Sequence, residues 1–137
     1  MIRNLIALLA LVAGSSAAAE SAPASPAAVV RAYAEAANRH DLEGFLALYD
    51  PAVRKYRFPG ELSSEGVEHN RAAYAKSFAA NPALKVEILD LMALGDKVVS
   101  HDRVTGLADG HSAEEITVYQ VQNGKITNIV YVQRIVS

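Results

Sequence analysis

The sequence of 137 residues contains no cysteine and no tryptophan. A chain without cysteine forms no disulfide, uses no thiolate nucleophile and holds no Cys-ligated zinc or iron–sulfur cluster. Basic residues are not in excess either, because 13 Lys and Arg stand against 15 Asp and Glu, for a formal net charge of −2. A chain of this charge has no positive field to attract the phosphates of nucleic acid. We therefore expect no nucleic-acid partner.

Apolar runs long enough to cross a membrane are also absent. The N-terminal run, residues 5–13, is preceded by Arg3 and followed by small residues at 17–19. A spanning helix needs about 20 apolar residues, whereas a positive charge, a short apolar run and small residues in this order are typical of a signal peptide. We expect residues 1–19 to be removed on export, so that the mature protein is periplasmic or secreted and has no stable membrane anchor.

The remaining sequence has the composition of a globular domain. Hydrophobic residues make up 51% of the chain and charged residues 20%, which suits a chain that buries a core. The length fits one domain. Residues 20–26 are rich in Ala, Pro and Ser, which predicts a flexible leader. Residues 27–137 are expected to form the domain.

Apolar residues recur at helical spacing in three segments, which predicts helices over 26–38, 42–49 and 66–81. Between the second and third helices, residues 53–58 alternate aromatic with basic side chains, which predicts a strand with its aromatic residues on one face. From residue 84 onward the period changes from helical to alternating, with a break near Ile88 that predicts a β-bulge.

Three turn dipeptides divide the second half of the chain into strands. Three successive hairpins make an antiparallel meander, and helices must cover one face of it, which is an α+β fold. A sheet that curves around helices leaves a cone with a mouth. The predicted strands are 84–94, 97–108, 112–122 and 125–135, separated by Gly95-Asp96, Asp109-Gly110 and Asn123-Gly124.

Six short motifs follow one another over residues 27–135. They are Val30-Arg31-Ala32-Tyr33, His40-Asp41-Leu42-Glu43-Gly44-Phe45, Leu48-Tyr49-Asp50, Gly66-Val67-Glu68, Gly95-Asp96-Lys97-Val98-Val99 and Asn123-Gly124-Lys125-Ile126. Their order and spacing resemble the SnoaL-like and ketosteroid-isomerase-like branch of the nuclear transport factor 2 (NTF2-like) superfamily. The resemblance implies an α+β cone of the NTF2-like, or cystatin-like, kind, in which three N-terminal helices pack on a curved antiparallel sheet that encloses a pocket. It also implies a homodimer through the outer face of strands 97–108 and 112–122.

The resemblance implies Tyr33 as a first catalytic candidate. In ketosteroid isomerases a tyrosine of the first helix donates a hydrogen bond to the developing enolate, and Tyr33 falls at that position. Their general-base aspartate has no counterpart in residues 55–59, and Thr117 stands where their protonated aspartate is expected. Ketosteroid isomerisation itself is therefore not expected, since it needs a positioned base.

A second SnoaL-like subgroup, with aldol-type chemistry, implies His101 as the other catalytic candidate. Residues 96–101 resemble that subgroup, which carries a pocket histidine at the position of His101. Its further polar residues are replaced here by Thr117, Asn128 and Val130. Histidine titrates near neutral pH without help from its surroundings. The acid–base hypothesis thus has His101 transferring the proton and Tyr33 polarising the substrate oxygen.

Aromatic residues are the candidates for ligand binding, because buried Tyr hydroxyls give an apolar cavity its polar anchors. The same side chains can equally form the core. Asp102 beside Arg103 is interpreted as part of a surface ionic ladder, and Glu114-Glu115 as a solvated rim, although one of the two can point inward. The four His show no metal-ligand spacing, so we expect no metal and no cofactor. The ligand-binding candidates are Tyr49, Tyr56, Phe58, Tyr74, Thr117, Tyr119 and Tyr131.

Two hypotheses about function stay open on this sequence. In the first, an exported SnoaL-like domain binds a small, mostly apolar organic molecule in a conical pocket and performs acid–base chemistry of isomerase, cyclase or lyase type. In the second, the domain is a non-catalytic ligand-binding or protein-interaction module. The fold hosts both kinds of protein, so the site has to decide between them.

The N-terminal pattern makes one testable prediction. The exported protein should begin at Glu20, because Ala17-Ala18-Ala19 suits a signal peptidase and the short apolar run does not suit a bilayer. N-terminal sequencing of the exported protein checks this, and a sequence that begins at Met1 would contradict it.

Overall fold

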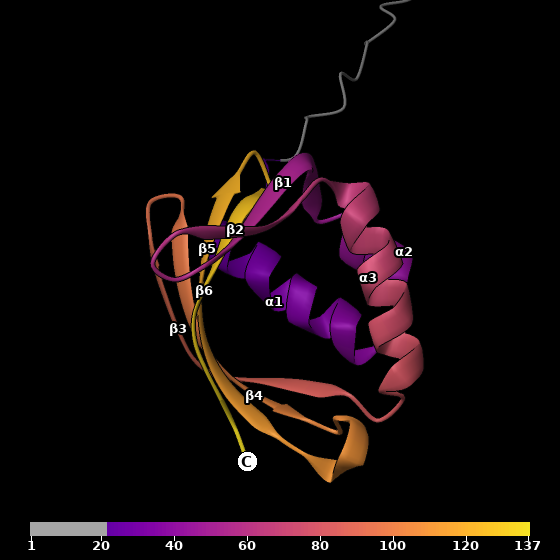
Figure 1. The fold of residues 1–137 in the computed structure, drawn as a ribbon. Coiled ribbons are helices and arrows are strands. Elements are labelled where there is room, and N and C mark those ends of the chain that lie inside the picture. Colours follow the sequence, from indigo (N-terminus) through magenta and orange to yellow (C-terminus); the bar gives the residue numbers. More distant parts are fainter. Residues whose placement is uncertain (1–21) are drawn as a thin grey trace, which may run out of the picture.

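The computed structural model describes residues 22–137, which form three helices and one six-stranded sheet (Figure 1). The predicted signal peptide and the first residues of the predicted leader lie outside the described residues. None of the described helices is long and apolar enough to cross a membrane. The elements are α1 (Pro26–Asn38), α2 (Leu42–Leu46), β1 (Tyr49–Arg57), β2 (Glu61–Glu65), α3 (Val67–Ala80), β3 (Lys85–Leu94), β4 (Lys97–Thr105), a 3₁₀ turn (Ala108–Gly110), β5 (Ala113–Gln122) and β6 (Lys125–Val136).

Side-chain caps begin the first two helices. The Ala28 amide donates to Ser25 Oγ over 3.2 Å, and Pro26 occupies the first turn of α1, where its missing N–H costs nothing. The Gly44 amide donates to Asp41 Oδ1 over 3.0 Å at the start of α2. The predicted second helix is too long, because α2 ends at Leu46 and Tyr49 already begins β1.

The sheet has the order β2-β1-β6-β5-β4-β3. Its second half is the predicted antiparallel meander β3-β4-β5-β6, and the register of β3 shifts between Ile88 and Asp90, which confirms the predicted bulge. The sheet is not antiparallel throughout, because β1 pairs with β6 in parallel. Strand β2 was not predicted, since Glu61–Glu65 is polar and carries no alternation.

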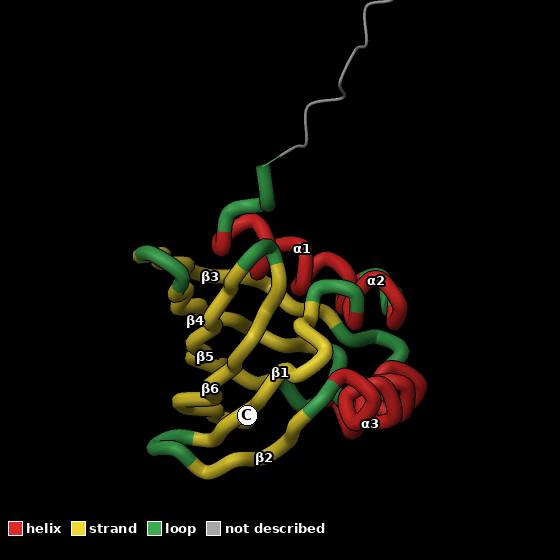
Figure 2. The backbone as a smooth tube through the Cα atoms, turned by 90° about the horizontal axis from the view of Figure 1, so that it is seen from above, coloured by secondary structure: helices red, strands yellow, loops and turns green. Residues whose placement is uncertain are grey.

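The helices cover one side of the sheet, as Figure 2 shows. Helix α1 lies in the concave face and packs against β3, β4 and β5, whereas α3 packs against α2, β1 and β2 (Figure 1). The core therefore forms between α1 and the inner side of the strands. Its most deeply buried residues include Val29, Val30, Phe45, Val53, Val98, Ile126 and Ile129.

Asn38 ties the end of α1 to the exposed edge of the sheet. Its Nδ2 donates to the Val86 carbonyl over 2.9 Å, and the Val86 amide donates to Asn38 Oδ1 over 2.6 Å. Strand β3 is an edge strand, so these backbone groups of Val86 have no strand beside them. One side chain thus satisfies them and fixes how deeply α1 enters the cone.

The loop after β4 packs directly on the loop before β3. Gly106 has φ +71°, and a Cβ built on it would stand 1.9 Å from the Ala83 carbonyl oxygen. The Ala108 amide donates to Asn81 Oδ1 over 2.8 Å in the same region. The contact between the two loops fixes the positions of Leu84 and Leu107, which line the cavity described below.

Gly106→Ala should destabilise the protein by about 2–4 kcal/mol, because a left-handed backbone and a backbone clash add together. The free energy of unfolding in urea measures the effect. The matched control is Gly95→Ala, which has φ +58° but no atom within 4 Å of the new Cβ, and it should lose only about 1 kcal/mol. Equal losses in the two variants would show that the contact between the loops contributes nothing.

Candidate active site

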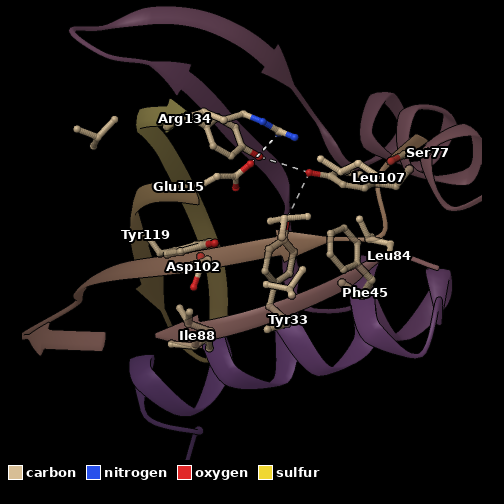
Figure 3. Close-up of a pocket in the computed structure, with 18 of the residues that line it drawn as sticks. Tyr33, Phe45, Ser77, Leu84, Ile88, Asp102, Leu107, Glu115, Tyr119 and Arg134 are labelled. Atoms are coloured by element: carbon tan, nitrogen blue, oxygen red, sulfur yellow. Dashed lines mark hydrogen bonds and ion pairs between the residues drawn. The ribbon is translucent and has the colours of Figure 1, made fainter. Parts of the chain in front are cut away.

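A cavity of about 610 Å³ opens between α1, α3 and the inner face of the sheet (Figure 3). This is the size of a pocket for a small organic molecule. Most of its wall is apolar or aromatic, and charged side chains reach it from β1, β4, β5 and β6. The apolar part consists of Val30, Ala34, Ala37, Phe45, Phe58, Phe78, Leu84, Val86, Ile88, Val104, Leu107 and Val132.

Four tyrosine hydroxyls meet at one end of the cavity. Tyr33 OH lies 2.6 Å from Tyr49 OH and 3.4 Å from Tyr74 OH. Tyr74 OH lies a further 3.4 Å from Tyr131 OH, so the group is a connected network. The Tyr33 ring stacks on Phe45 with centroids 4.2 Å apart, which fixes the direction of its hydroxyl.

Lys55 of β1 extends into this tyrosine network. The residue is only 4% exposed, and its Nζ donates to Tyr49 OH over 2.6 Å and to Tyr74 OH over 2.9 Å. Burial lowers the pKa of the Lys55 ammonium, because removing the charge from water is costly. Burial alone would raise the pKa of Tyr74, but the Lys55 charge and hydrogen bonds from Lys55, Tyr131 and Tyr33 lower it to about 8.

Two carboxyl groups occupy another wall of the cavity. Asp102 of β4 and Glu115 of β5 are direct partners across the two strands and both line the cavity (Figure 3). Asp102 is 5% exposed, its Oδ2 accepts from Ser100 Oγ over 2.8 Å, and its Oδ1 is buried with no hydrogen-bond partner. Arg134 Nη1 pairs with Glu115 Oε1 over 2.7 Å.

Burial raises the pKa of both carboxyl groups. For Asp102 the Ser100 hydrogen bond opposes this shift, and for Glu115 the Arg134 charge opposes it while Asp102 adds to it. Burial also raises the pKa of Tyr119, which lies beside Asp102 in Figure 3. A carboxyl group with a raised pKa can give and take protons closer to neutral pH than an exposed one.

The structure brings most of the predicted ligand-binding residues to the cavity, but not all. Phe58, Tyr74, Tyr119 and Tyr131 line it, with Phe58 exposed at its mouth, and the catalytic candidate Tyr33 lines it as well. Tyr49 and Thr117 are buried but do not line it. Tyr56 does not line it either, because Lys55 takes the inner face of β1 and the alternation turns Tyr56 to the other face.

His101 is not in the cavity. The buried side chains of β4 are Val98, Ser100, Asp102 and Val104, so His101 lies on the outer face, where its side chain is 42% exposed. Its Nε2 lies 3.1 Å from Glu114 Oε2, and Arg103 pairs with the same carboxylate. This placement corrects the hypothesis that His101 and Tyr33 act on one bound molecule.

The sequence did not single out three charged residues that lie on the inner face of the sheet, namely Lys55, Asp102 and Glu115. The sequence favoured a surface ionic ladder for Asp102 and a solvated rim for Glu114-Glu115, although one of these two could point inward. It gave Lys55 no role in the pocket. The signal was in the alternation of β4, which puts Asp102 with Val98 and Val104. An acidic residue between two buried valines on one strand face indicates a buried carboxyl group.

The sequence profile of the SnoaL-like domain matches residues 30–129. The chain belongs to this family. No curated protein sequence matches the chain significantly. Among residues 22–137 no group of three or more His, Asp or Glu is arranged to hold a metal ion.

Solved structures with the same fold include several that this SnoaL-like domain resembles at low identity. A cystatin-fold protein from Novosphingobium aromaticivorans has a TM-score of 0.73 and 22% identity, over 80% of this chain and 99% of that one. A proposed ketosteroid isomerase from Kribbella flavida has a TM-score of 0.65 and 20% identity, over 78% and 76%. An LEH-like epoxide hydrolase from M. tuberculosis has a TM-score of 0.67 and 15% identity, over 78% and 80%. These likenesses confirm the NTF2-like, cystatin-like α+β fold.

The buried Asp102 carboxyl group predicts a pH-dependent stability. Its pKa is raised in the folded state, so the protonated carboxyl group stabilises the fold. This contribution to the free energy of unfolding is complete below the unfolded pKa of about 3.9 and is lost as the pH rises through the folded pKa. Asp102→Asn should therefore gain stability relative to the wild type as the pH rises from about 4 through the folded pKa of Asp102, by about 1.4 kcal/mol for each unit of the shift. Urea unfolding at several pH values measures this.

Asp109→Asn, which removes a carboxyl group from an exposed turn, is the matched control. A difference between Asp102→Asn and the wild type that is constant with pH would contradict the raised pKa of Asp102.

Proposed function

We propose that this SnoaL-like domain binds a small, mostly apolar organic molecule with a carbonyl or hydroxyl oxygen, and that Asp102 exchanges a proton with it. The observation that carries the proposal is the pair of carboxyl groups, Asp102 and Glu115, in the wall of an otherwise largely apolar cavity.

The wall of the cavity supports this class of ligand. Aliphatic and aromatic side chains surround most of its volume of about 610 Å³, which favours an apolar molecule. The hydroxyls of Tyr33, Tyr74 and Tyr131 stand together at one end and can donate to a ligand oxygen. The ligand would therefore point its oxygen toward the tyrosines and its carbon skeleton toward the apolar wall.

Asp102 supports the chemical half of the proposal. Its Oδ1 has no partner, and a burial-raised pKa suits a group that must both accept and return a proton. Glu115, held by Arg134, lies directly opposite Asp102 on β5, where burial and the Asp102 charge raise its own pKa. The names of two similar structures, a proposed ketosteroid isomerase and an LEH-like epoxide hydrolase, are compatible with such chemistry.

The alternative is a non-catalytic ligand-binding module. It is favoured by one observation, namely that the tyrosine hydroxyls already hydrogen-bond to each other and to Lys55. Hydroxyls that are satisfied within the protein gain less from a ligand oxygen than free ones. The experiment below separates the two functions.

We further propose that the domain works as an exported homodimer. Its outer face carries apolar side chains between polar ones, with Ile116 40% exposed and Val99 and Val118 half-buried beside it. A stable homodimer through this face would bury on the order of 2,000 Å².

The proposed function predicts catalysed proton exchange. β-Tetralone, an apolar bicyclic ketone, should bind, and the protein should exchange its protons next to the carbonyl for deuterium in heavy water, which ¹H NMR follows. Asp102→Asn should lower the rate by about 10²- to 10⁴-fold, the usual effect of losing a general base. His101→Gln is the control and should stay within a factor of about three, below that range, because His101 lies outside the cavity.

Binding of β-tetralone without exchange above the buffer rate would support the non-catalytic module. Exchange that survives Asp102→Asn but falls in His101→Gln would overturn the assignment of the acid–base group.

A further inference from the structure

Lys55 is a buried cation without an acidic partner. Its residue is 4% exposed, and none of the ion pairs formed among residues 22–137 includes it. An unpaired buried charge is costly to keep in a protein interior. Here the ammonium contacts only phenols, through two hydrogen bonds and through the ring faces of Tyr49 and Tyr74, whose centroids lie 4.7 and 4.4 Å from Nζ.

We infer that Tyr74 is the catalytic residue that exchanges a proton with the ligand oxygen, and that Lys55 is the positioning residue that holds its phenolate. The inference rests on the proposed function and extends it. In the proposed function Asp102 exchanges a proton with a ligand carbon, and the inference names the residue that exchanges a proton with the ligand oxygen. It also moves this role from Tyr33, the tyrosine expected by resemblance, to Tyr74.

The contacts single out Tyr74 among the four tyrosines. Tyr74 lines the cavity and also receives a hydrogen bond from Lys55. Tyr49 receives the other Lys55 hydrogen bond but does not line the cavity. Tyr33 and Tyr131 line the cavity but reach Lys55 only through another tyrosine. Only Tyr74 thus joins the ligand space directly to the buried charge.

The groups around Tyr74 favour its ionised form. Among residues 22–137 Lys55 is the one cation that hydrogen-bonds to it. The hydroxyls of Tyr33 and Tyr131, each 3.4 Å from that of Tyr74, can donate to a phenolate, and Tyr49 shares the Lys55 ammonium with it. Those phenols keep their own protons, since burial and the neighbouring Tyr74 hold the pKa values of Tyr33, Tyr49 and Tyr131 well above the usual range. The titratable and charged groups on the surrounding elements are Tyr33 (α1), Tyr49, Lys55 and Arg57 (β1), His69 (α3), Asp102 (β4), Glu115 and Tyr119 (β5), and Tyr131 and Arg134 (β6).

The proton transfers balance without an oxidant or a reductant. The Asp102 carboxylate takes a proton from the carbon next to the ligand carbonyl, and the electron pair of the broken C–H bond forms the C=C bond of the enol. The carbonyl oxygen takes the phenolic proton of Tyr74, whose phenolate is left beside the Lys55 ammonium. The protonated carboxyl group exchanges its proton with water, which in heavy water supplies a deuteron. When it then gives this deuteron to carbon and the enol returns its proton to the phenolate, both residues are restored.

Near-ultraviolet titration of the free protein tests the inference directly. The chain has six Tyr and no Trp, so the absorbance of tyrosinate is not obscured. In the wild type one tyrosine of the six should ionise at about pH 8, ahead of the buried Tyr33, Tyr49, Tyr119 and Tyr131, whose pKa values burial raises above the usual range. Tyr74→Phe should remove this early step. Tyr56→Phe is the control, because Tyr56 lies outside the cavity, and should leave it unchanged.

Lys55→Met should also remove the early step while it preserves the fold, because Met is similar in length and replaces a buried charge by an apolar group. Circular dichroism checks the fold of this variant. If Lys55→Met does not fold, Tyr74→Phe still decides the question. An early step that is absent from the wild type, or that survives in Tyr74→Phe, overturns the inference.

The exchange of β-tetralone then tests the catalytic half. Tyr74→Phe and folded Lys55→Met should each lower the exchange rate by about 10²-fold, the scale of one lost donor to a developing oxyanion. The titration needs no ligand, so its failure refutes the roles of Lys55 and Tyr74 alone. A wild type with the early step but without any exchange overturns the proposed function, and with it the catalytic role of Tyr74.

Discussion

Burial of helix α1 in the concave face of the sheet is the contact on which both the core and the cavity depend. Val29 and Val30 fill the space against the strands, but one turn further along Ala34 and Ala37 face the same interior. A larger aliphatic side chain at either position would bury more apolar surface and so stabilise the folded state by about 1.5–3 kcal/mol. The small residues leave that space open, so the helix that builds the core also keeps the cavity from closing.

The sheet then decides which charges face this space. Lys55 on β1 and the carboxyl groups of Asp102 and Glu115 all lie on the inner side, where each raises the free energy of the folded state unless it is compensated. Phenols compensate the lysine, Ser100 one oxygen of Asp102, and Arg134 the glutamate. Replacing all of them by apolar residues would give a simpler core. Stability alone therefore does not account for them, whereas the proton exchange that we propose would.

Local sequence patterns predicted the parts of this arrangement that depend on residues near one another in the sequence. Turn dipeptides placed the three hairpins, and a break in alternation placed the bulge at Ile88. Which face of β4 is inner is only weakly marked in its sequence, because both faces carry apolar and polar side chains, and the packing of α1 decides it. The same limit explains the error at β1. Alternation along this strand favoured the aromatic residues for the inner face, but in the parallel pairing with β6 Lys55 lies on the inner face and Tyr56 on the outer one.

Separation along the sheet keeps the buried lysine and the buried carboxyl groups from neutralising one another. Strand β6 stands between the strand of Lys55 and the strand of Glu115, and β5 stands between β6 and the strand of Asp102. A flat sheet would hold these groups on separate patches of surface. The curvature around α1 instead turns the tyrosine end and the carboxyl wall toward one cavity (Figure 3). A bound molecule would then meet a donor of protons and an acceptor of protons at different points, which is the arrangement that moving a proton between carbon and oxygen requires.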